Sequence, residues 1–140
     1  MSQSAAVCTN SHTNARPCPC GSGLAYAACC GRWHAGPLHL QAPDAEALMR
    51  SRYCAYVLDL GDYLLHTWHV STRPARVPPA EPGLRWLGLQ VRSHLLQGTD
   101  AATVEFIARS KLGGRAHRLQ ETSRFVREGG RWYYVDGDVA

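Results

Sequence analysis

Residues 18–30 read Cys-Pro-Cys-Gly-Ser-Gly-Leu-Ala-Tyr-Ala-Ala-Cys-Cys, and this stretch decides how the N-terminal part of the chain folds. Cys18, Cys20, Cys29 and Cys30 are four of the six cysteines in the 140-residue sequence. Thiolates this close together repel one another unless a cation neutralises them, and zinc is the ion that four sulfur ligands usually hold in a tetrahedron. The spacing therefore predicts a metal knuckle with these four cysteines as ligands and Zn²⁺ as cofactor.

Disulfide bonds and redox-active thiols are the alternative interpretations. Two bridges across so tight a turn would depart from the Cα separation of about 4.4–6.8 Å that a disulfide needs. The first eight residues have neither the basic start nor the apolar run of a secretory signal, so we expect a cytoplasmic protein. A redox-active cysteine pair would be expected as Cys-x-x-Cys beside a βαβ pattern, and this combination is absent from the sequence. Both alternatives stay open, with zinc favoured.

The residues between the cysteine pairs suit a turn followed by a short helix. Gly21 and Gly23 can adopt positive φ angles, and Ser22 can cap a helix over residues 24–28. One helical turn does not persist alone in water, so metal binding should drive the folding of this segment. His34 is an alternative fourth ligand in place of Cys30, or a packing histidine.

The cysteines, Gly21-Ser-Gly23 and Tyr26 together resemble the SEC-C motif, the zinc-binding module at the C-terminus of the SecA translocation ATPase. The resemblance implies a surface that contacts another protein, related to secretion or to chaperones, with Leu24 and Tyr26 as the candidate contact residues. Leucine and alanines stand beside Tyr26 where members of that family often carry lysines. The basic surface of those relatives is therefore not expected here.

Composition indicates a soluble globular chain: 45% of the residues are hydrophobic, 19% are charged, and the formal net charge is +4. No segment reaches the roughly 20 apolar residues of a membrane span. The arginines of residues 115–131 alternate with Glu121 and Glu128, which favours a solvated sheet face over a nucleic-acid site. We divide the chain into a flexible tail over residues 1–15, the knuckle over 16–36 and a second domain over 37–140, with Cys8 of the tail as a stray thiol.

The second domain begins with helical periodicity. Apolar residues recur every three or four positions after Asp44, which predicts a helix that Asp44 caps and Gly61 ends. Residues 62–69 indicate a shorter helix. Four prolines between residues 70 and 83 exclude regular structure there.

The rest of the domain alternates as strands do. Strands are expected over residues 84–96, 103–109, 115–127 and 131–136, with Leu87, Leu89 and Val91 on one face of the first. Gly113-Gly114 and Gly129-Gly130 supply tight turns, so the sheet should be antiparallel. The order of elements predicts an α+β fold in which the helices pack in the concave face of a curved sheet.

This order resembles the cone-shaped nuclear transport factor 2-like fold, and together with the knuckle it resembles the bacterial YchJ family. The resemblance covers residues 17–137 and implies fold and metal, but no established activity. The segments that carry it, besides the knuckle, are Gly31 with His34 and Gly36, Leu48–Tyr53 with Ala55, Thr67–His69 with Ser71, Glu121, Ser123 and Phe125, and Arg131–Gly137.

The strand phase predicts a polar cluster inside the cone. If Leu119 and Phe125 face inward, Glu121 and Ser123 do so too, because side chains alternate along a strand. An arginine of the first helix, Arg50 or Arg52, would pair with the carboxylate, in a ligand cavity or in a purely structural ion pair. We assign the candidate ligand cavity to Arg50, Trp68, Glu121, Ser123 and Trp132.

Two classes of function follow. In the first, which we favour, the protein is an adaptor that binds another protein through the knuckle, with a candidate homodimer contact through the sheet. In the second, the cone binds or transforms a small molecule. The sequence has no nucleophile–base pair, phosphate loop or cofactor fingerprint, so we assign no catalytic residue.

Overall fold

The structure is a computed structural model, and it describes residues 15–140. The predictions made for Cys8 and for the tail up to residue 14 lie outside the described residues. The chain forms the short 3₁₀ helix η1 (Tyr26–Ala28) and the helices α2 (Gly31–His34), α3 (Ala45–Leu58) and α4 (Gly61–His66). Four strands follow, β1 (Arg85–Leu96), β2 (Ala101–Leu112), β3 (Arg115–Glu128) and β4 (Arg131–Val139).

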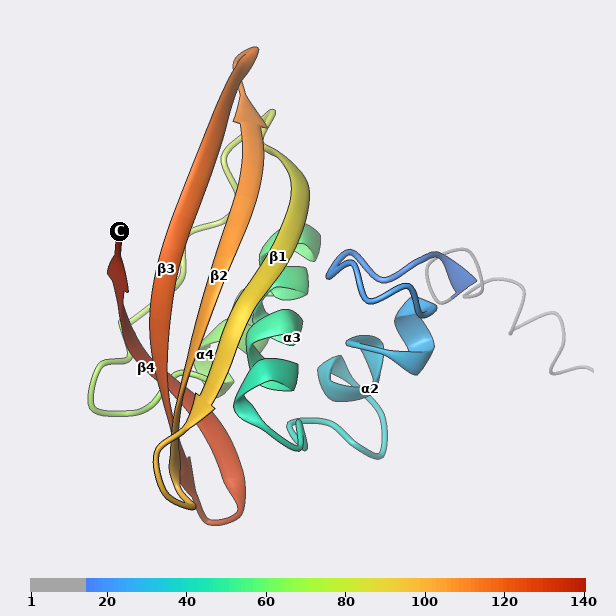
Figure 1. The fold of residues 1–140 in the computed structure, drawn as a ribbon. Helices are drawn as coiled ribbons and strands as arrows, with labels where there is room; N and C mark the ends of the chain where they lie inside the picture. The colour runs from blue at the N-terminus through green and yellow to red at the C-terminus, as the bar shows by residue number, and fades with distance from the viewer. Residues whose placement is uncertain (1–14) are drawn as a thin grey trace, which may run out of the picture.

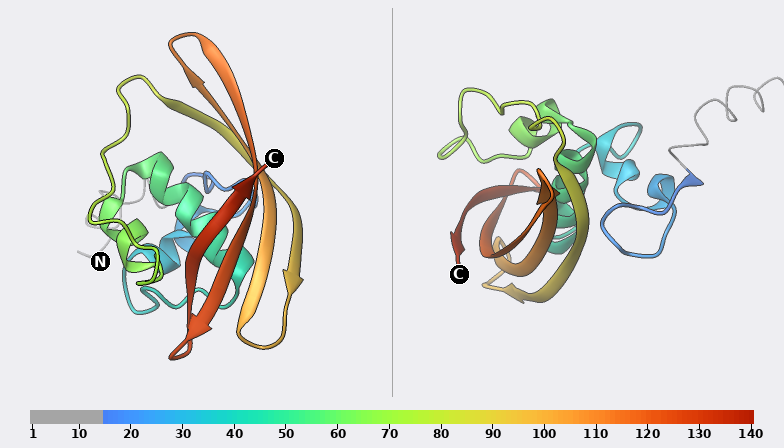
Figure 2. Two further views of the ribbon diagram at one scale, coloured as in Figure 1. Left: turned by 90° about the vertical axis from the view of Figure 1, so that its left-hand side faces the viewer. Right: turned by 90° about the horizontal axis from the view of Figure 1, so that it is seen from above.

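The four strands form one antiparallel sheet in the order β1-β2-β3-β4, which confirms the predicted α+β fold. The sheet is strongly curved, and α3 packs against its concave side (Figures 1 and 2). The two glycine pairs close the β2–β3 and β3–β4 hairpins, and all four of these glycines have positive φ angles. Two consecutive positive φ angles are what the tightest hairpin turns require.

Helix α3 begins where the sequence predicts, because the Asp44 carboxylate accepts a hydrogen bond of 2.7 Å from the Ala47 N–H. It ends earlier than predicted. Asp59 adopts the left-handed conformation (φ 60°) and its N–H bonds back to the last turn, so Leu58 is the final helical residue. Gly61 is therefore the first residue of α4 and not a helix terminator.

Helix α4 also ends earlier than predicted, at His66 rather than His69. The backbone turns there to pair with β4: the Tyr134 N–H donates to the Thr67 carbonyl at 2.8 Å, and the His69 N–H donates to the Tyr134 carbonyl at 2.7 Å. These bonds fix the connection to the last strand. Residues 70–83 contain no helix or strand, as the prolines predicted.

The first strand departs from simple alternation. The pairing of β1 with β2 slips between Trp86 and Gly88 and again between Val91 and Ser93. The first bulge turns Leu87 outward, where it is 53% exposed, while Trp86 packs against the core. The prediction that Leu87 shares a face with Leu89 and Val91 was therefore wrong.

The core lies between α3 and the concave face of the sheet. Buried side chains from the helix meet Val104 and Ala108 of β2 and Phe125 of β3. The knuckle packs on α3 as well, and its cysteines belong to the same buried cluster. No helix among residues 15–140 is long and apolar enough to cross a membrane.

Candidate metal centre and cavity

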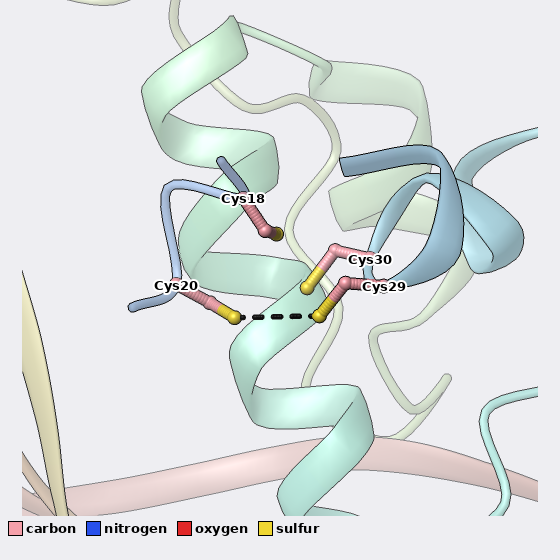
Figure 3. Close-up of side chains that lie close together, drawn as sticks. All are labelled: Cys18, Cys20, Cys29 and Cys30. Carbon is pink, nitrogen blue, oxygen red and sulfur yellow. Dashed lines mark hydrogen bonds between the residues drawn. The ribbon is translucent and has the colours of Figure 1, made fainter. Parts of the chain in front are cut away.

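The four predicted metal ligands lie together. The sulfur atoms of Cys18, Cys20, Cys29 and Cys30 are all within 4.8 Å of one another, and all four side chains are buried (Figure 3). The sulfurs of Cys20 and Cys29 are 3.6 Å apart. Four sulfurs about 2.3 Å from one tetrahedral ion are roughly 3.8 Å from each other, so the cluster needs only small shifts to hold such an ion. The residues present fit a metal.

Backbone geometry brings the two cysteine pairs together. Gly21 (φ 81°) and Gly23 (φ 87°) both take the left-handed conformation, and the Cys18 N–H donates to the Leu24 carbonyl at 2.8 Å. Ser22 does not cap a helix as predicted. Its hydroxyl accepts from the Leu24 N–H and lies 3.1 Å from the Cys29 sulfur, while the expected helix is the single 3₁₀ turn of η1.

Two side chains bond to the backbone around the cluster. Arg50 of α3 donates from Nη1 to the Cys20 carbonyl at 3.0 Å and from Nε to Glu46, also at 3.0 Å. His34 uses both ring nitrogens elsewhere: Nε2 lies 2.8 Å from the Ser51 carbonyl and Nδ1 lies 2.5 Å from the Tyr26 hydroxyl. His34 is thus a link between knuckle and cone, and it is not part of the sulfur cluster.

The cysteine thiols of the cluster differ in pKa. Hydrogen bonds with neighbouring thiols lower the pKa of Cys20 and raise the pKa values of Cys30 and of a fifth cysteine, Cys54. Buried thiolates cannot all ionise side by side without a counter-charge. A bound cation removes this limit, since a coordinating thiol is deprotonated outright.

A second site lies in the cone, between α3 and the concave face of the sheet. It is a cavity of about 210 Å³. Its lining residues come from α3 and all four strands: Met49, Arg52, Tyr53, Tyr56, Trp86, Phe106, Ala108, Leu119, Glu121, Ser123, Phe125 and Tyr134. Most of them are apolar or aromatic, which is typical of small-molecule pockets.

The polar groups of the cavity converge on one side chain. Glu121 accepts a hydrogen bond of 2.7 Å from the Ser123 hydroxyl, and the Tyr134 hydroxyl lies 3.5 Å away. Burial, with Glu121 nearby, raises the pKa of Tyr134 to about 12, so the phenol stays protonated. The strand phase of Leu119, Glu121, Ser123 and Phe125 is therefore as the alternation predicted.

The arginine of the cavity is Arg52, but among the described residues it forms no ion pair with Glu121, so the predicted pairing of an arginine with this carboxylate was wrong. Arg52 is 5% exposed and lies over the rings of Trp68 and Tyr134, with its guanidinium carbon 4.9 and 4.5 Å from their centroids. Its Nη1 donates to the Leu64 carbonyl at 2.8 Å and to the Thr67 hydroxyl at 2.7 Å. Burial lowers the pKa of Arg52 to about 10, so it stays charged at neutral pH.

Three residues that we assigned to the cavity lie elsewhere. Arg50 points from α3 toward the knuckle, because it is two positions from Arg52 and so lies on a different helix face. Trp68 has the Arg52 guanidinium over its ring and meets Tyr134 in an edge-to-face contact, and it does not line the cavity. Trp132 is buried in the core, where Arg127 lies over its ring.

Comparison with known proteins agrees with this architecture. Residues 17–32 match the SEC-C motif, and residues 44–137 match the family described as YchJ, middle NTF2-like domain. The chain belongs to the YchJ family. A UPF0225 protein of Methylibium petroleiphilum is 67% identical over 88% of both chains, and one of Bordetella pertussis is 62% identical over 87% of this chain and 92% of that one.

Two solved structures resemble this YchJ-family protein along most of its length. The solution structure of a SEC-C motif containing protein from Rhodopseudomonas palustris is 35% identical, with a TM-score of 0.76 over 89% of this chain and 99% of that one. A crystal structure of a SEC-C motif containing protein from Psychrobacter arcticus is 26% identical, with a TM-score of 0.74 over 92% and 85% of the two chains. The family is uncharacterised, so the likeness establishes the fold and the motif.

Sequence reasoning missed one cysteine that lies beside the sulfur cluster. Cys54 of α3 is completely buried, and its sulfur lies 3.5 Å from that of Cys18. It follows Arg50 by four positions, so the two share one face of the helix. The four-residue spacing between Arg50 and Cys54 could have indicated Cys54 from the sequence, but only with the knowledge that the knuckle packs on that face of α3.

Proposed function

We propose that the knuckle binds one Zn²⁺ ion through Cys18, Cys20, Cys29 and Cys30 and that this ion is structural. The observation that carries the proposal is the buried cluster of four sulfurs within 4.8 Å of one another. Four thiolates fill a tetrahedral shell and leave no position for water or substrate, which is the pattern of structural zinc. Soft sulfur donors favour zinc over magnesium, calcium or manganese.

The test is metal content by native mass spectrometry on the purified protein and on Cys18→Ser. One zinc per chain in the wild type, lost in the variant, is the expected result. A metal-free wild type that is two hydrogens lighter for each bond formed would show oxidised cysteines and would overturn the proposal. In that case a thiol-redox role becomes the better explanation of the cluster.

We propose further that the cone binds a small molecule. The cavity supports this, because an apolar wall surrounds the polar group in which Ser123 and Tyr134 meet Glu121, and Arg52 also lines the cavity. A ligand with an apolar body and one hydrogen-bonding group fits such a lining. The Ser123 hydroxyl does lie beside a carboxylate base, but no histidine or cysteine joins them in the lining, so the proposal is binding and not catalysis.

Three aromatic probes of different charge test the cavity: indole, benzylamine and benzoate, followed by NMR chemical shifts of the protein amides. We expect at least one probe to shift amides of β2 and β3 beside the cavity. Ala108→Leu, which places three extra carbons in this space, should abolish those shifts, whereas Ala116→Leu on an exposed strand end is the matched control. No binding of any probe at millimolar concentration would contradict the proposal.

An adaptor role is the second candidate. The knuckle and the segment after it expose Leu24 (51%) and Leu38 (48%), apolar side chains available to a protein partner. Tyr26 is less available because its hydroxyl bonds to His34. Replacing Leu24 with Ser should weaken recovery of a cross-linked partner without changing the melting temperature; equal recovery would argue against this role. A homodimer through the sheet stays a prediction that sedimentation analysis can test.

A further inference from the structure

A fifth cysteine adjoins the metal centre from the cone. Cys54 is in the C-terminal half of α3, 0% exposed, and its sulfur lies 3.5 Å from the sulfur of Cys18, which is 36 residues earlier in the chain. This distance is far longer than the roughly 2.05 Å of a disulfide bond. It is close to the roughly 3.8 Å between two thiolates on one tetrahedral ion.

The five sulfurs are not equivalent. Cys20, Cys30 and Cys54 are each at most 1% exposed, whereas Cys29 is 7% exposed, and the Ser22 hydroxyl lies 3.1 Å from the Cys29 sulfur. A tetrahedral ion takes four sulfurs, so one of the five is always in excess. Cys29 is the member of the cluster with the most contact with solvent, and the Ser22 hydroxyl is a hydrogen-bond partner of its sulfur.

We propose that Cys54 is an alternative thiolate ligand of the metal centre that takes the place of Cys29, so that the ion joins the knuckle to α3. The inference rests on the proposed metal binding. In the exchange, the Cys54 thiol releases its proton and forms a sulfur–metal bond, while the Cys29–metal bond breaks and that thiolate takes up a proton. The number of thiolates, protons and electrons is unchanged, so the step needs no oxidant or reductant.

The surroundings of α3 favour such a link. Arg50 lies one helical turn before Cys54 and donates to the Cys20 carbonyl, and His34 lies 2.8 Å from the Ser51 carbonyl of the same helix. The knuckle is therefore held against this helix face by bonds other than the metal. These bonds keep the knuckle beside Cys54, whose sulfur lies 3.5 Å from that of Cys18.

The experiment compares Cys29→Ser, Cys54→Ser and the double variant, with Cys18→Ser as the control that removes a shared ligand. Metal content is measured by native mass spectrometry, and the ligand set is measured from the sulfur-to-cobalt charge-transfer absorption of the Co²⁺-loaded proteins. We expect both single variants to keep one metal and four-thiolate absorption. We expect the double variant to lose one thiolate from the absorption and to yield its metal to a chelator that leaves the single variants loaded.

The opposite results separate this inference from the metal proposal. If the wild type binds one metal but Cys29→Ser has already lost a thiolate from its cobalt spectrum, Cys54 is not a ligand and the inference is overturned. Equal spectra for Cys29→Ser and the double variant would overturn it as well. A wild type without metal would overturn both proposals. Amide NMR spectra of the sheet show whether each variant is folded, so loss of metal is not confused with loss of structure.

Discussion

The carboxylate of Glu121 on β3 lies against the backbone of Gly137 on the neighbouring strand β4. A Cβ atom built on residue 137 would overlap Oε2 of Glu121 and come within 3.0 Å of its Cγ. Gly137 pairs with Ser123, whose hydroxyl donates to the same carboxylate. The missing side chain at position 137 is therefore what admits Glu121 to its place in the cavity lining.

Replacing Gly137 with Ala should displace Glu121 from this position. We expect the free energy of unfolding to fall by about 1–3 kcal/mol, the usual cost of forcing extra volume into a packed site. The hydrogen bond from Ser123 to Glu121 should be lost at the same time. Urea denaturation measures the first effect, and the amide shifts of residues 121 and 123 report the second.

Gly88→Ala is the matched control, since residue 88 is also a strand glycine but a Cβ there meets nothing within 4 Å. We expect this variant to unfold at nearly the wild-type urea concentration. Equal destabilisation by the two substitutions would show that glycine conformation, and not the contact with Glu121, decides the result.

Gly31 has a similar relationship with Tyr26 in the knuckle. A Cβ at position 31 would lie 2.8 Å from the Tyr26 carbonyl oxygen and 2.9 Å from a carbon of its ring. Gly31→Ala should therefore push Tyr26 away from His34 and widen the turn that carries Cys29 and Cys30. We expect weaker metal binding, measured as the chelator concentration that removes half of the metal.

The control for Gly31→Ala is Gly61→Ala. Residue 61 is also the first residue of a helix, but the nearest atom to an added Cβ is 3.9 Å away, an ordinary contact. Alanine is the better helix former, so this variant should be neutral or slightly stabilising. Unchanged metal retention in Gly31→Ala would refute the proposed role of the contact with Tyr26.

The sequence predicted those parts of the fold that local chemistry decides. The Asp44 cap, the two glycine turns and the phase of Glu121 and Ser123 depend on residues close together in the chain. The bulge at Leu87 was not predictable in this way, because a bulge is set by pairing with the neighbouring strand. The early end of α4 has the same cause, since Thr67 and His69 pair with Tyr134 on the last strand.

The same difference between local sequence and tertiary packing applies to the candidate sites. Cys18, Cys20, Cys29 and Cys30 could be grouped from spacing alone, because all four lie within thirteen residues. The choice between Arg50 and Arg52 depended on how α3 is rotated, which tertiary packing decides. Cys54 was missed for a related reason: its partner Cys18 is brought to it only when the knuckle packs on α3.

The hydrogen bonds of His34 predict that acid destabilises the knuckle. Burial lowers the pKa of His34 below its ordinary 6.5, and its two ring nitrogens face Ser51 and Tyr26. With Nε2–H donating to the Ser51 carbonyl, the neutral Nδ1 accepts from the Tyr26 hydroxyl. A proton on Nδ1 would abolish that acceptor.

The sign of the effect follows from linkage. Because the folded protein holds His34 neutral, the unfolded chain binds more protons below pH 6.5, and stability falls as the pH decreases through that value. His34→Gln should be less stable at pH 7.5 but should lose less stability between pH 7 and 5. The thiols titrate in the wild type and in the variant alike. The difference between the two series of denaturation measurements across pH therefore reports on His34 alone. If stability falls equally with pH in both proteins, the prediction is contradicted.

Removing the metal should unfold the knuckle and leave the cone intact. The knuckle contains only short helices, and its backbone bonds from Cys18 to Leu24 and from Tyr26 to Arg16 close small loops that cannot persist alone. The cone has its own core between α3 and the sheet. Hydrogen exchange after treatment with a chelator should therefore be faster for the amides of residues 18–34 and unchanged for those of β2 and β3. Loss of protection in the sheet as well would contradict this prediction. It would show that the ion stabilises the whole molecule, through the buried cluster that the knuckle cysteines and the cone share.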